Sequence, residues 1–394
     1  MRKILVINSG SSSIKLKLFL MPSENVEASA LIERIGQEMG KITFKTDKHE
    51  IEKEIPIPDH ETGLKAVAEM LLDKKKGVIS HEDEILAVGH RVVHGGSRYS
   101  GSLEIDEGVK KKIKDLFDLA PLHNPPSYKG IVVSEMIFPK AKQIAVFDTA
   151  FHQSIPTKAH KYAIPNKLLE KDNIQVYGFH GISHKYVADR AIEFLKKQSS
   201  KIITIHLGNG CSMTAVQDGR SYDTSMGFSP ASGLIMGTRS GDLDYAVIFH
   251  MIENIGYTPA EVNEILQKQS GMLGLTGYSD LRDIEKEAMN GNHECKLALE
   301  MNAYRIKKYI GAYIAAMNGV DAIVFTAGIG ENSDLLREMV CSNMSYLGIQ
   351  LEPYKNKVRS NQLRVISKED SRVTVLVIPT NEELEIANQA FDLL

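Results

Sequence analysis

The fold is decided by the stretch ILVINSGSSSIK, residues 4–15, which has a counterpart in IITIHLGNGCSM, residues 202–213. Each stretch reads as an apolar strand, a turn of glycine and small polar residues, and the start of a second strand. The shared order indicates a duplicated fold of two similar lobes, each presenting a hairpin turn to a central cleft. The alternative is a chance similarity between two ordinary hairpins.

Outward from these hairpins, short β-rich runs recur beside longer helical patterns, which is typical of an α/β protein with mixed sheets. Further strands are expected at 144–147, 322–326 and 373–378, and helices at 184–196 and 296–318. A chain of 394 residues exceeds the size at which a single core usually keeps growing, so two domains are expected. We place the first at residues 1–150 plus 381–394 and the second at residues 151–380.

The composition indicates a soluble cytoplasmic protein. A formal net charge of -3 and a pI near 6.5 create no overall basic field, so nucleic acid is not an expected partner. Only Cys211, Cys295 and Cys341 are present, without CxxC spacing, which favours reduced thiols over disulfides or a zinc site. No apolar run approaches the ~20 residues that span a bilayer, so no membrane association is expected.

Three Gly-rich turns are candidates for phosphate or nucleotide binding. The first, residues 8–13, offers backbone N–H groups with Lys15 nearby, but it lacks the P-loop pattern, and such a turn often only joins two strands. The second is residues 206–210. The third, residues 325–333, follows a strand and opens a helix, where glycines let a ring and ribose lie against the backbone; it would equally suit an ordinary turn capped by Ser333.

Charged residues between glycines form a second group of candidates. They occur at residues 89–96, 177–181 and 236–242, in contexts that look like loops. A surface or core explanation suits any one of them, but three together favour a ligand. Asp148 ends an apolar strand, where α/β folds place catalytic carboxylates, although it could merely cap a turn. Glu382 and its neighbour open the last helix, where one carboxylate could hold hydrated Mg²⁺.

Taken together, these segments resemble the acetokinase family, within the superfamily that also contains sugar kinases, actin and heat-shock chaperone ATPases. The resemblance covers essentially the whole chain. It implies a duplicated βββαβαβα core, a homodimer, and Mg²⁺-dependent (or Mn²⁺-dependent) in-line phosphoryl transfer from ATP to acetate, giving acetyl phosphate and ADP reversibly. A loose phosphoryl-transfer transition state needs positioning and charge stabilisation, which arginine, histidine and Mg²⁺ supply.

The resemblance also implies roles for individual residues. Asn8 and Glu382 look like metal-site residues. Arg91 is similar to the arginine that binds the carboxylate, Asp148 to the catalytic acid/base residue, and His180 and Arg239 to the transition-state stabilisers. The apolar pocket for the methyl group corresponds to Val93, Leu122, Phe179 and Pro230. The ATP-binding residues correspond to Ser11, Ser13, Lys15, His206, Leu207, Gly208, Asn209, Gly210, Asp280, Leu281, Arg282, Gly328, Ile329, Gly330, Glu331 and Asn332.

Two departures from the family pattern flank Arg239. Residues 229–233 read Ser-Pro-Ala-Ser-Gly where Thr-Pro-Leu-Glu-Gly is common, and residues 242–245 lack the frequent Asp-Pro ending. Propionate or butyrate is therefore an alternative acceptor, since one methylene in an apolar pocket is worth only ~1–3 kcal/mol. A further alternative is a non-metabolic actin-like ATPase, which would have no need of a carboxylate pocket.

Overall fold

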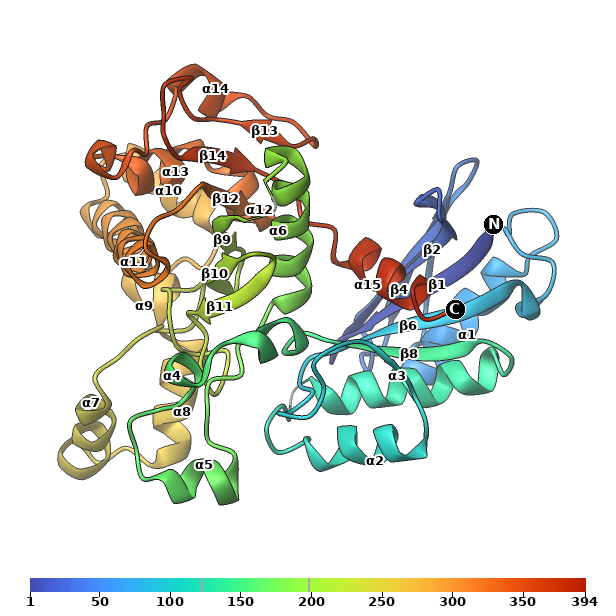
Figure 1. The fold of residues 1–394 in the computed structure, drawn as a ribbon. Helices are drawn as coiled ribbons and strands as arrows, with labels where there is room; N and C mark the ends of the chain where they lie inside the picture. Colours follow the sequence, from blue (N-terminus) through green and yellow to red (C-terminus); the bar gives the residue numbers. More distant parts are fainter. Residues whose placement is uncertain (122, 198) are drawn as a thin grey trace. The chain divides into compact units, whose positions relative to one another are not determined.

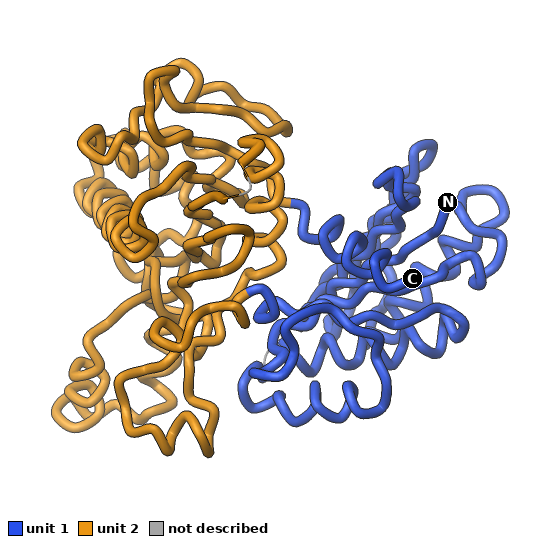
Figure 2. Tube along the Cα trace, in the orientation of Figure 1, with its two compact units in different colours: residues 1–151, 381–394 blue, residues 152–380 orange. Residues whose placement is uncertain are grey.

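The computed structural model describes residues 1–121, 123–197 and 199–394. The chain divides into two compact units, shown in Figure 2: unit 1 comprises Met1–Phe151 and Asn381–Leu394, and unit 2 comprises His152–Thr380. Each unit contains a mixed sheet with helices packed against it, which confirms the α/β class (Figure 1). No helix in these described ranges is long and apolar enough to cross a membrane.

Unit 1 is built on a sheet with strand order β5-β4-β3-β2-β1-β6-β8-β7. Helices α1 and α3 pack against it, and so does the C-terminal helix α15. Its elements are β1 (Arg2–Ser9), β2 (Ser13–Met21), β3 (Asn25–Glu33), β4 (Gly40–Thr46), β5 (Glu50–Ile55), α1 (His60–Leu71), β6 (Ile85–Val92), β7 (Leu103–Glu104), α2 (Glu107–Asp115), α3 (Asn124–Ile137), β8 (Lys142–Phe147) and α15 (Glu382–Phe391).

Unit 2 has the sheet order β11-β10-β9-β12-β14-β13, with α6, α11 and α12 packed against β9. Its strands are β9 (Lys201–Leu207), β10 (Cys211–Gln217), β11 (Arg220–Thr224), β12 (Ala322–Thr326), β13 (Arg364–Val365) and β14 (Thr374–Val377). Its helices are α4 (Thr157–His160), α5 (Asn166–Asp172), α6 (Gly181–Leu195), α7 (Tyr245–His250), α8 (Pro259–Lys268), α9 (Gly271–Thr276), α10 (Leu281–Met289), α11 (His293–Met317), α12 (Ala327–Asn332), α13 (Asp334–Cys341) and α14 (Pro353–Lys357).

The two sheets share one five-stranded pattern, so the duplication inferred from the paired hairpins is confirmed. In unit 1, β3, β2 and β1 form an antiparallel meander, and β6 and β8 then continue parallel to β1. In unit 2, β11, β10 and β9 form the same meander, and β12 and β14 continue parallel to β9. The carboxyl ends of the three parallel strands therefore meet at one edge of each sheet, where α/β folds commonly bind ligands.

Candidate functional site

The carboxyl edge of the unit 1 sheet gathers the predicted charged residues of that unit. Asn8 lies near the end of β1, Arg91 near the end of β6, and Asp148 directly after β8. The backbone N–H of Asp148 donates to the carbonyl oxygen of Val92 at 3.0 Å, which fixes the residue beside the end of β6. Helix α15 begins at the same edge with Glu382. One sheet edge therefore collects side chains that lie far apart in the sequence.

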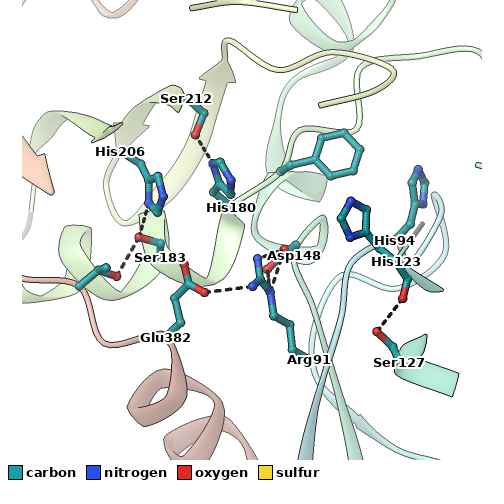
Figure 3. A network of polar contacts seen from close by, with 12 residues as sticks. Arg91, His94, His123, Ser127, Asp148, His180, Ser183, His206, Ser212 and Glu382 are labelled. Atoms are coloured by element: carbon teal, nitrogen blue, oxygen red, sulfur yellow. Dashed lines mark hydrogen bonds and ion pairs between the residues drawn. The ribbon is translucent and has the colours of Figure 1, made fainter. Parts of the chain in front are cut away.

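Arg91 lies between two carboxylates, as Figure 3 shows. Its Nε and Nη2 donate to Oδ2 of Asp148 at 3.1 and 2.7 Å, and its Nη1 is 3.3 Å from Oε2 of Glu382. Burial works against the charge on Arg91, but the carboxylates of Asp148 and Glu382 outweigh it and raise the pKa of Arg91. Burial conversely raises the pKa of Asp148, and the guanidinium opposes that rise. The ionised form of Arg91 is thus stabilised by the carboxylates, and the ionised form of Asp148 is stabilised by the guanidinium.

Arg91 lies on strand β6, so the sequence-based expectation of a Gly-rich loop at residues 89–96 was wrong for its first half. Gly89 is present for packing: a Cβ atom there would come within 2.6 Å of the Ile386 side chain on α15. The strand pattern was hidden because a glycine and a histidine interrupt the apolar run. A glycine required by a neighbouring helix resembles a loop glycine when only the sequence is read.

The remaining predicted residues of unit 1 lie around the first hairpin turn and the end of β6. Lys15 is exposed and pairs with Asn8 across the β1–β2 ladder. Ser11 is exposed in the turn, and the carbonyl of Ser13 accepts the Gly10 N–H at 2.8 Å. Val93 follows β6 and is half-buried. Leu122 lies outside the described residues.

Unit 2 contains a pocket of about 670 Å³ at the carboxyl edge of its sheet. It brings together parts of the second turn, the start of α10 and helix α12. The predicted nucleotide residues that line it are Gly208, Asn209, Asp280, Leu281, Arg282, Gly328, Ile329 and Asn332, and the structure adds Ser279, Glu285, Ser333 and Arg359. Glu285 and Arg359 carried no motif in the sequence, because isolated charged residues in polar segments give no pattern.

Five predicted nucleotide residues of unit 2 do not line this pocket: His206, Leu207, Gly210, Gly330 and Glu331. Leu207 is buried, and the Glu331 carboxylate accepts the Thr380 N–H at 3.1 Å. The third turn is itself helical, since α12 begins at Ala327 directly after β12, whereas the sequence suggested a turn before the helix. Ser333 does cap the following helix α13, because its hydroxyl accepts the Leu336 N–H at 3.0 Å.

His180 occupies the left-handed position (φ 57°) that starts α6. Its Nδ1 lies 2.8 Å from Oγ of Ser212 (Figure 3), and its ring stacks on His206 with centroids 4.3 Å apart. Just before it, the carbonyl of Phe179 contacts Nε2 of His152 at 3.0 Å. The orientation of His180 is therefore fixed by its backbone conformation, by the contact of Nδ1 with Ser212 and by stacking on His206.

Arg239 provides the second cationic candidate in unit 2. Its Nη1 donates to the carbonyl oxygen of Pro230 at 2.8 Å, and across residues 1–121, 123–197 and 199–394 no carboxylate pairs with it. Burial lowers its pKa. A Cβ atom on Gly210 would lie 3.4 Å from Nε2 of His180 and 3.8 Å from Nη1 of Arg239, so both groups face this turn. A cationic donor without a carboxylate beside a Gly-rich turn suits an anionic ligand.

The donors at the unit 1 edge have the chemistry that Mg²⁺ requires. The amide oxygen of Asn8 and the carboxylate of Glu382 are hard oxygen ligands. Among the residues described, no group of three or more His, Cys, Asp or Glu side chains could enclose a metal by itself. Mg²⁺ commonly uses one or two carboxylates together with water and phosphate oxygens, so this donor set fits a substrate-assisted site rather than a closed protein cage.

Comparisons with known proteins agree with this arrangement. The sequence profile of the acetokinase family matches residues 3–388. The acetate kinase of Flavobacterium johnsoniae is 63% identical over 392 residues, covering 100% of this chain and 99% of that protein. The crystal structure of Porphyromonas gingivalis acetate kinase superposes with a TM-score of 0.95 at 43% identity, and a propionate kinase from Francisella tularensis with 0.93 at 41%, each covering 100% of both chains. This chain belongs to the acetokinase family.

Proposed function

We propose that this chain is an acetate kinase that transfers the γ-phosphoryl group of ATP to acetate. A carboxylate oxygen of acetate attacks the γ-phosphorus, the bond from that phosphorus to the β–γ bridging oxygen breaks, and acetyl phosphate and ADP result. The full-length similarity to proteins named acetate kinase supports this reaction. The geometric observation that carries it is Arg239, which faces the Gly210 turn with His180 and has no carboxylate partner among the described residues.

Unit 2 is proposed to bind the nucleotide. Its pocket of about 670 Å³ has a suitable size for ATP, since ligand pockets commonly enclose ~300–1,000 Å³. The exposed backbone of Gly328 permits close approach of a flat ring, and a Cβ there would meet nothing within 4 Å. His180 and Arg239 then stabilise the charge that spreads over the transferring phosphoryl oxygens.

Unit 1 is proposed to bind the acceptor carboxylate through Arg91. A guanidinium has five N–H donors; Nε and one N–H of Nη2 donate to Asp148, and Nη1 is ion-paired with Glu382 at 3.3 Å. N–H groups on the two terminal nitrogens therefore remain for a substrate carboxylate. The residues that the family resemblance assigns to the methyl group, Val93, Leu122, Phe179 and Pro230, are proposed to receive it.

Asp148 is proposed to orient the acceptor or the metal rather than to remove a proton. Acetate is already ionised near neutral pH, because the pKa of such an acid is ~4. The bond from Arg91 holds the Asp148 carboxylate in place at 2.7 Å. Substitution of Asp148 by asparagine should lower turnover strongly, and near-normal turnover would contradict this role.

Asn8 and Glu382 are proposed to hold Mg²⁺, or Mn²⁺ in its place, with Lys15 close to the phosphates. The ion, when bound, neutralises charge on the phosphate oxygens. The pairing of Lys15 with Asn8 across the β1–β2 ladder places the amide and the ammonium group on neighbouring strands.

The reaction is tested by trapping acyl phosphate with hydroxylamine in the presence of ATP, Mg²⁺ and acetate, propionate or butyrate in parallel. Acetate is expected to give the highest kcat/KM. The propionate kinase among the similar structures makes propionate the second candidate, and a higher kcat/KM for propionate would favour it. The absence of acyl phosphate with all three acids, in a folded protein that hydrolyses ATP, would instead favour an actin-like ATPase.

We further propose that the protein is a cytoplasmic homodimer. The segment that contains α7 exposes large apolar side chains, among them Tyr245 (75%), Phe249 (54%) and Ile255 (59%). Exposed apolar groups in one segment are typical of a protein–protein contact, and a second copy of the chain would cover them. Light scattering should give twice the monomer mass of 43.7 kDa, and Phe249→Glu should shift it toward the monomer.

A further inference from the structure

Behind His180 lies a chain of buried hydroxyl and imidazole groups. Oγ of Ser212 is 2.8 Å from Nδ1 of His180 and 2.7 Å from Nε2 of His184. Nδ1 of His184 is in turn 2.7 Å from Oγ1 of Thr204. Ser212, His184 and Thr204 are all 0% exposed. Their protons cannot be rearranged by direct contact with water, so donor and acceptor counting constrains where each proton lies.

The counting leaves two arrangements. The Ser212 hydroxyl has one proton and touches two ring nitrogens, so it donates to one and accepts from the other. Burial, with the nearby His152 and His206, lowers the pKa of His184 far below its usual value, so His184 is neutral and has one N–H. In the first arrangement, Thr204 donates to His184, His184 donates to Ser212, and Ser212 donates to His180. In the second, His180 donates to Ser212, Ser212 donates to His184, and His184 donates to Thr204.

The distances favour the chain that runs toward His180. In the opposite direction, Thr204 would use its single proton on the carbonyl oxygen of Thr214 at 3.4 Å, which is a long hydrogen bond. In the direction toward His180, the same proton forms the 2.7 Å bond to His184. His180 then accepts at Nδ1. When the ring of His180 is neutral, its proton therefore lies on Nε2, the nitrogen that faces the Gly210 turn.

The surroundings of His180 make the location of this proton important. The N-terminus of α6 carries partial positive charge, and Arg239 faces the same turn. Both therefore disfavour a positive charge on the His180 ring. A neutral histidine can donate to an anion only from its protonated nitrogen. The ring with its proton on Nδ1 would present a lone pair to the phosphoryl oxygens and repel them.

We infer that Ser212, His184 and Thr204 are positioning residues that hold the His180 proton on Nε2, so that His180 donates a hydrogen bond to the transferring phosphoryl group. The inference rests on the proposed kinase reaction for its functional consequence. The location of the proton follows from the contacts within unit 2. Neither the hydroxyl groups nor His184 takes part in bond making or breaking.

Conservative variants test the relay through the division between kcat and KM. Ser212→Ala should lower kcat by roughly 10–100-fold, the cost known for losing a group that orients a metal-binding histidine, with the KM for ATP and acetate unchanged. Thr204→Val is isosteric and should lower kcat by roughly 3–10-fold, whereas Thr204→Ser keeps the hydroxyl and should retain the wild-type value. Thr214→Val is the matched control, since Thr214 is equally buried but its hydroxyl pairs with Thr224.

Nitrogen NMR of ¹⁵N-histidine-labelled protein, assigned with His180→Asn, reads the proton location without any turnover. The wild type should show Nδ1 of His180 unprotonated and Nε2 protonated, and Ser212→Ala should show a mixture. A wild-type ring protonated on Nδ1 alone, or equal kcat values for Thr204→Val and Thr204→Ser, would overturn the relay. A wild type that forms no acyl phosphate would overturn the kinase reaction, while the nitrogen spectrum would still decide the tautomer.

Discussion

Two arginines with similar expected chemistry are held in opposite ways. Arg91 in unit 1 is bonded to Asp148 and paired with Glu382, whereas Arg239 in unit 2 has carbonyl and thioether contacts and, within the described ranges, no carboxylate. The neighbouring carboxylates raise the pKa of Arg91, and burial lowers that of Arg239. Arg91 therefore has carboxylate partners within its own unit, while the charge of Arg239 can be neutralised by an anionic ligand.

The difference predicts that the two arginines contribute differently to stability. Removing one member of a buried ion pair leaves its partner uncompensated, which costs far more than the pair itself contributes. Removing a buried cation that lacks a carboxylate leaves no such partner. The same substitution should thus affect folding in unit 1 and mainly turnover in unit 2.

The largest expected effect on stability comes from Arg91→Ala. It should lower the free energy of unfolding by about 3–5 kcal/mol, because the Asp148 carboxylate, 2% exposed, would lose its guanidinium. Arg239→Ala, the matched variant, should change it by about 1 kcal/mol or less. Urea denaturation followed by circular dichroism measures both. Arg91→Met combined with Asp148→Asn should recover part of the loss, and equal destabilisation by the two alanine variants would remove the contrast.

Acid should weaken unit 2 through His152, whose two ring nitrogens contact Ser221 and the Phe179 carbonyl. Burial lowers the pKa of His152 to about 4, against about 6.5 in the unfolded chain, so the unfolded state binds more protons between these values. This contribution is complete above about pH 6.5 and is lost as the pH falls toward about 4.

The consequence is measurable as a difference between two proteins. From about pH 7.5 to about pH 5, wild-type protein should lose about 2 kcal/mol more unfolding free energy than His152→Gln. Urea titrations at the two pH values provide the comparison. Parallel losses in both proteins would show that His152 is not the group responsible.

Gly210→Ala tests whether Arg239 and His180 need the space beside the turn. The new methyl group would lie 3.3 Å from the His180 ring and 3.8 Å from Nη1 of Arg239, so kcat should fall roughly 10-fold through misplacement of these groups. Gly311→Ala on α11 is the control, because a Cβ there meets nothing within 4 Å, and it should slightly stabilise the helix. Unchanged kcat in Gly210→Ala would place the reacting phosphate elsewhere.

The smallest effect is expected at Val93, two residues after Arg91. Val93→Ala should raise the kcat/KM for propionate relative to acetate by about 5-fold, the lower end of the ~1–3 kcal/mol that one methylene in an apolar pocket is worth. Competition between the two acids in the hydroxylamine assay measures the ratio. A ratio equal to that of the wild type would exclude Val93 from the methyl pocket.

Local sequence patterns predicted the elements that recur in both units. The apolar runs of β1 and β9 and their Gly-rich turns were found because strands and turns are specified by residues that are adjacent in the sequence. Strand β6 was missed because its Gly89 is required by close packing against Ile386, a residue on the last helix. A requirement set by a tertiary neighbour leaves no local pattern.

The candidate site divides in the same way. Asp148 and Arg239 were found from their strand end and flanking glycines, which mark exposed backbone at a ligand site. Ser212 and Thr204 were not, since each is an ordinary buried strand residue whose importance arises from its contact with His184. His184 carried one signal, its spacing of four residues from His180 at the start of α6.

Steady-state kinetics of Arg239→Ala and Arg91→Ala under conditions where both are folded tests the central contrast most directly. Arg239→Ala should lower kcat by roughly 10²–10³-fold with little change in the KM for acetate, as expected of a donor used only in the transition state. Arg91→Ala should chiefly raise that KM. Small and equal effects on kcat and KM in both variants would contradict the division between a paired binding arginine and an unpaired catalytic one.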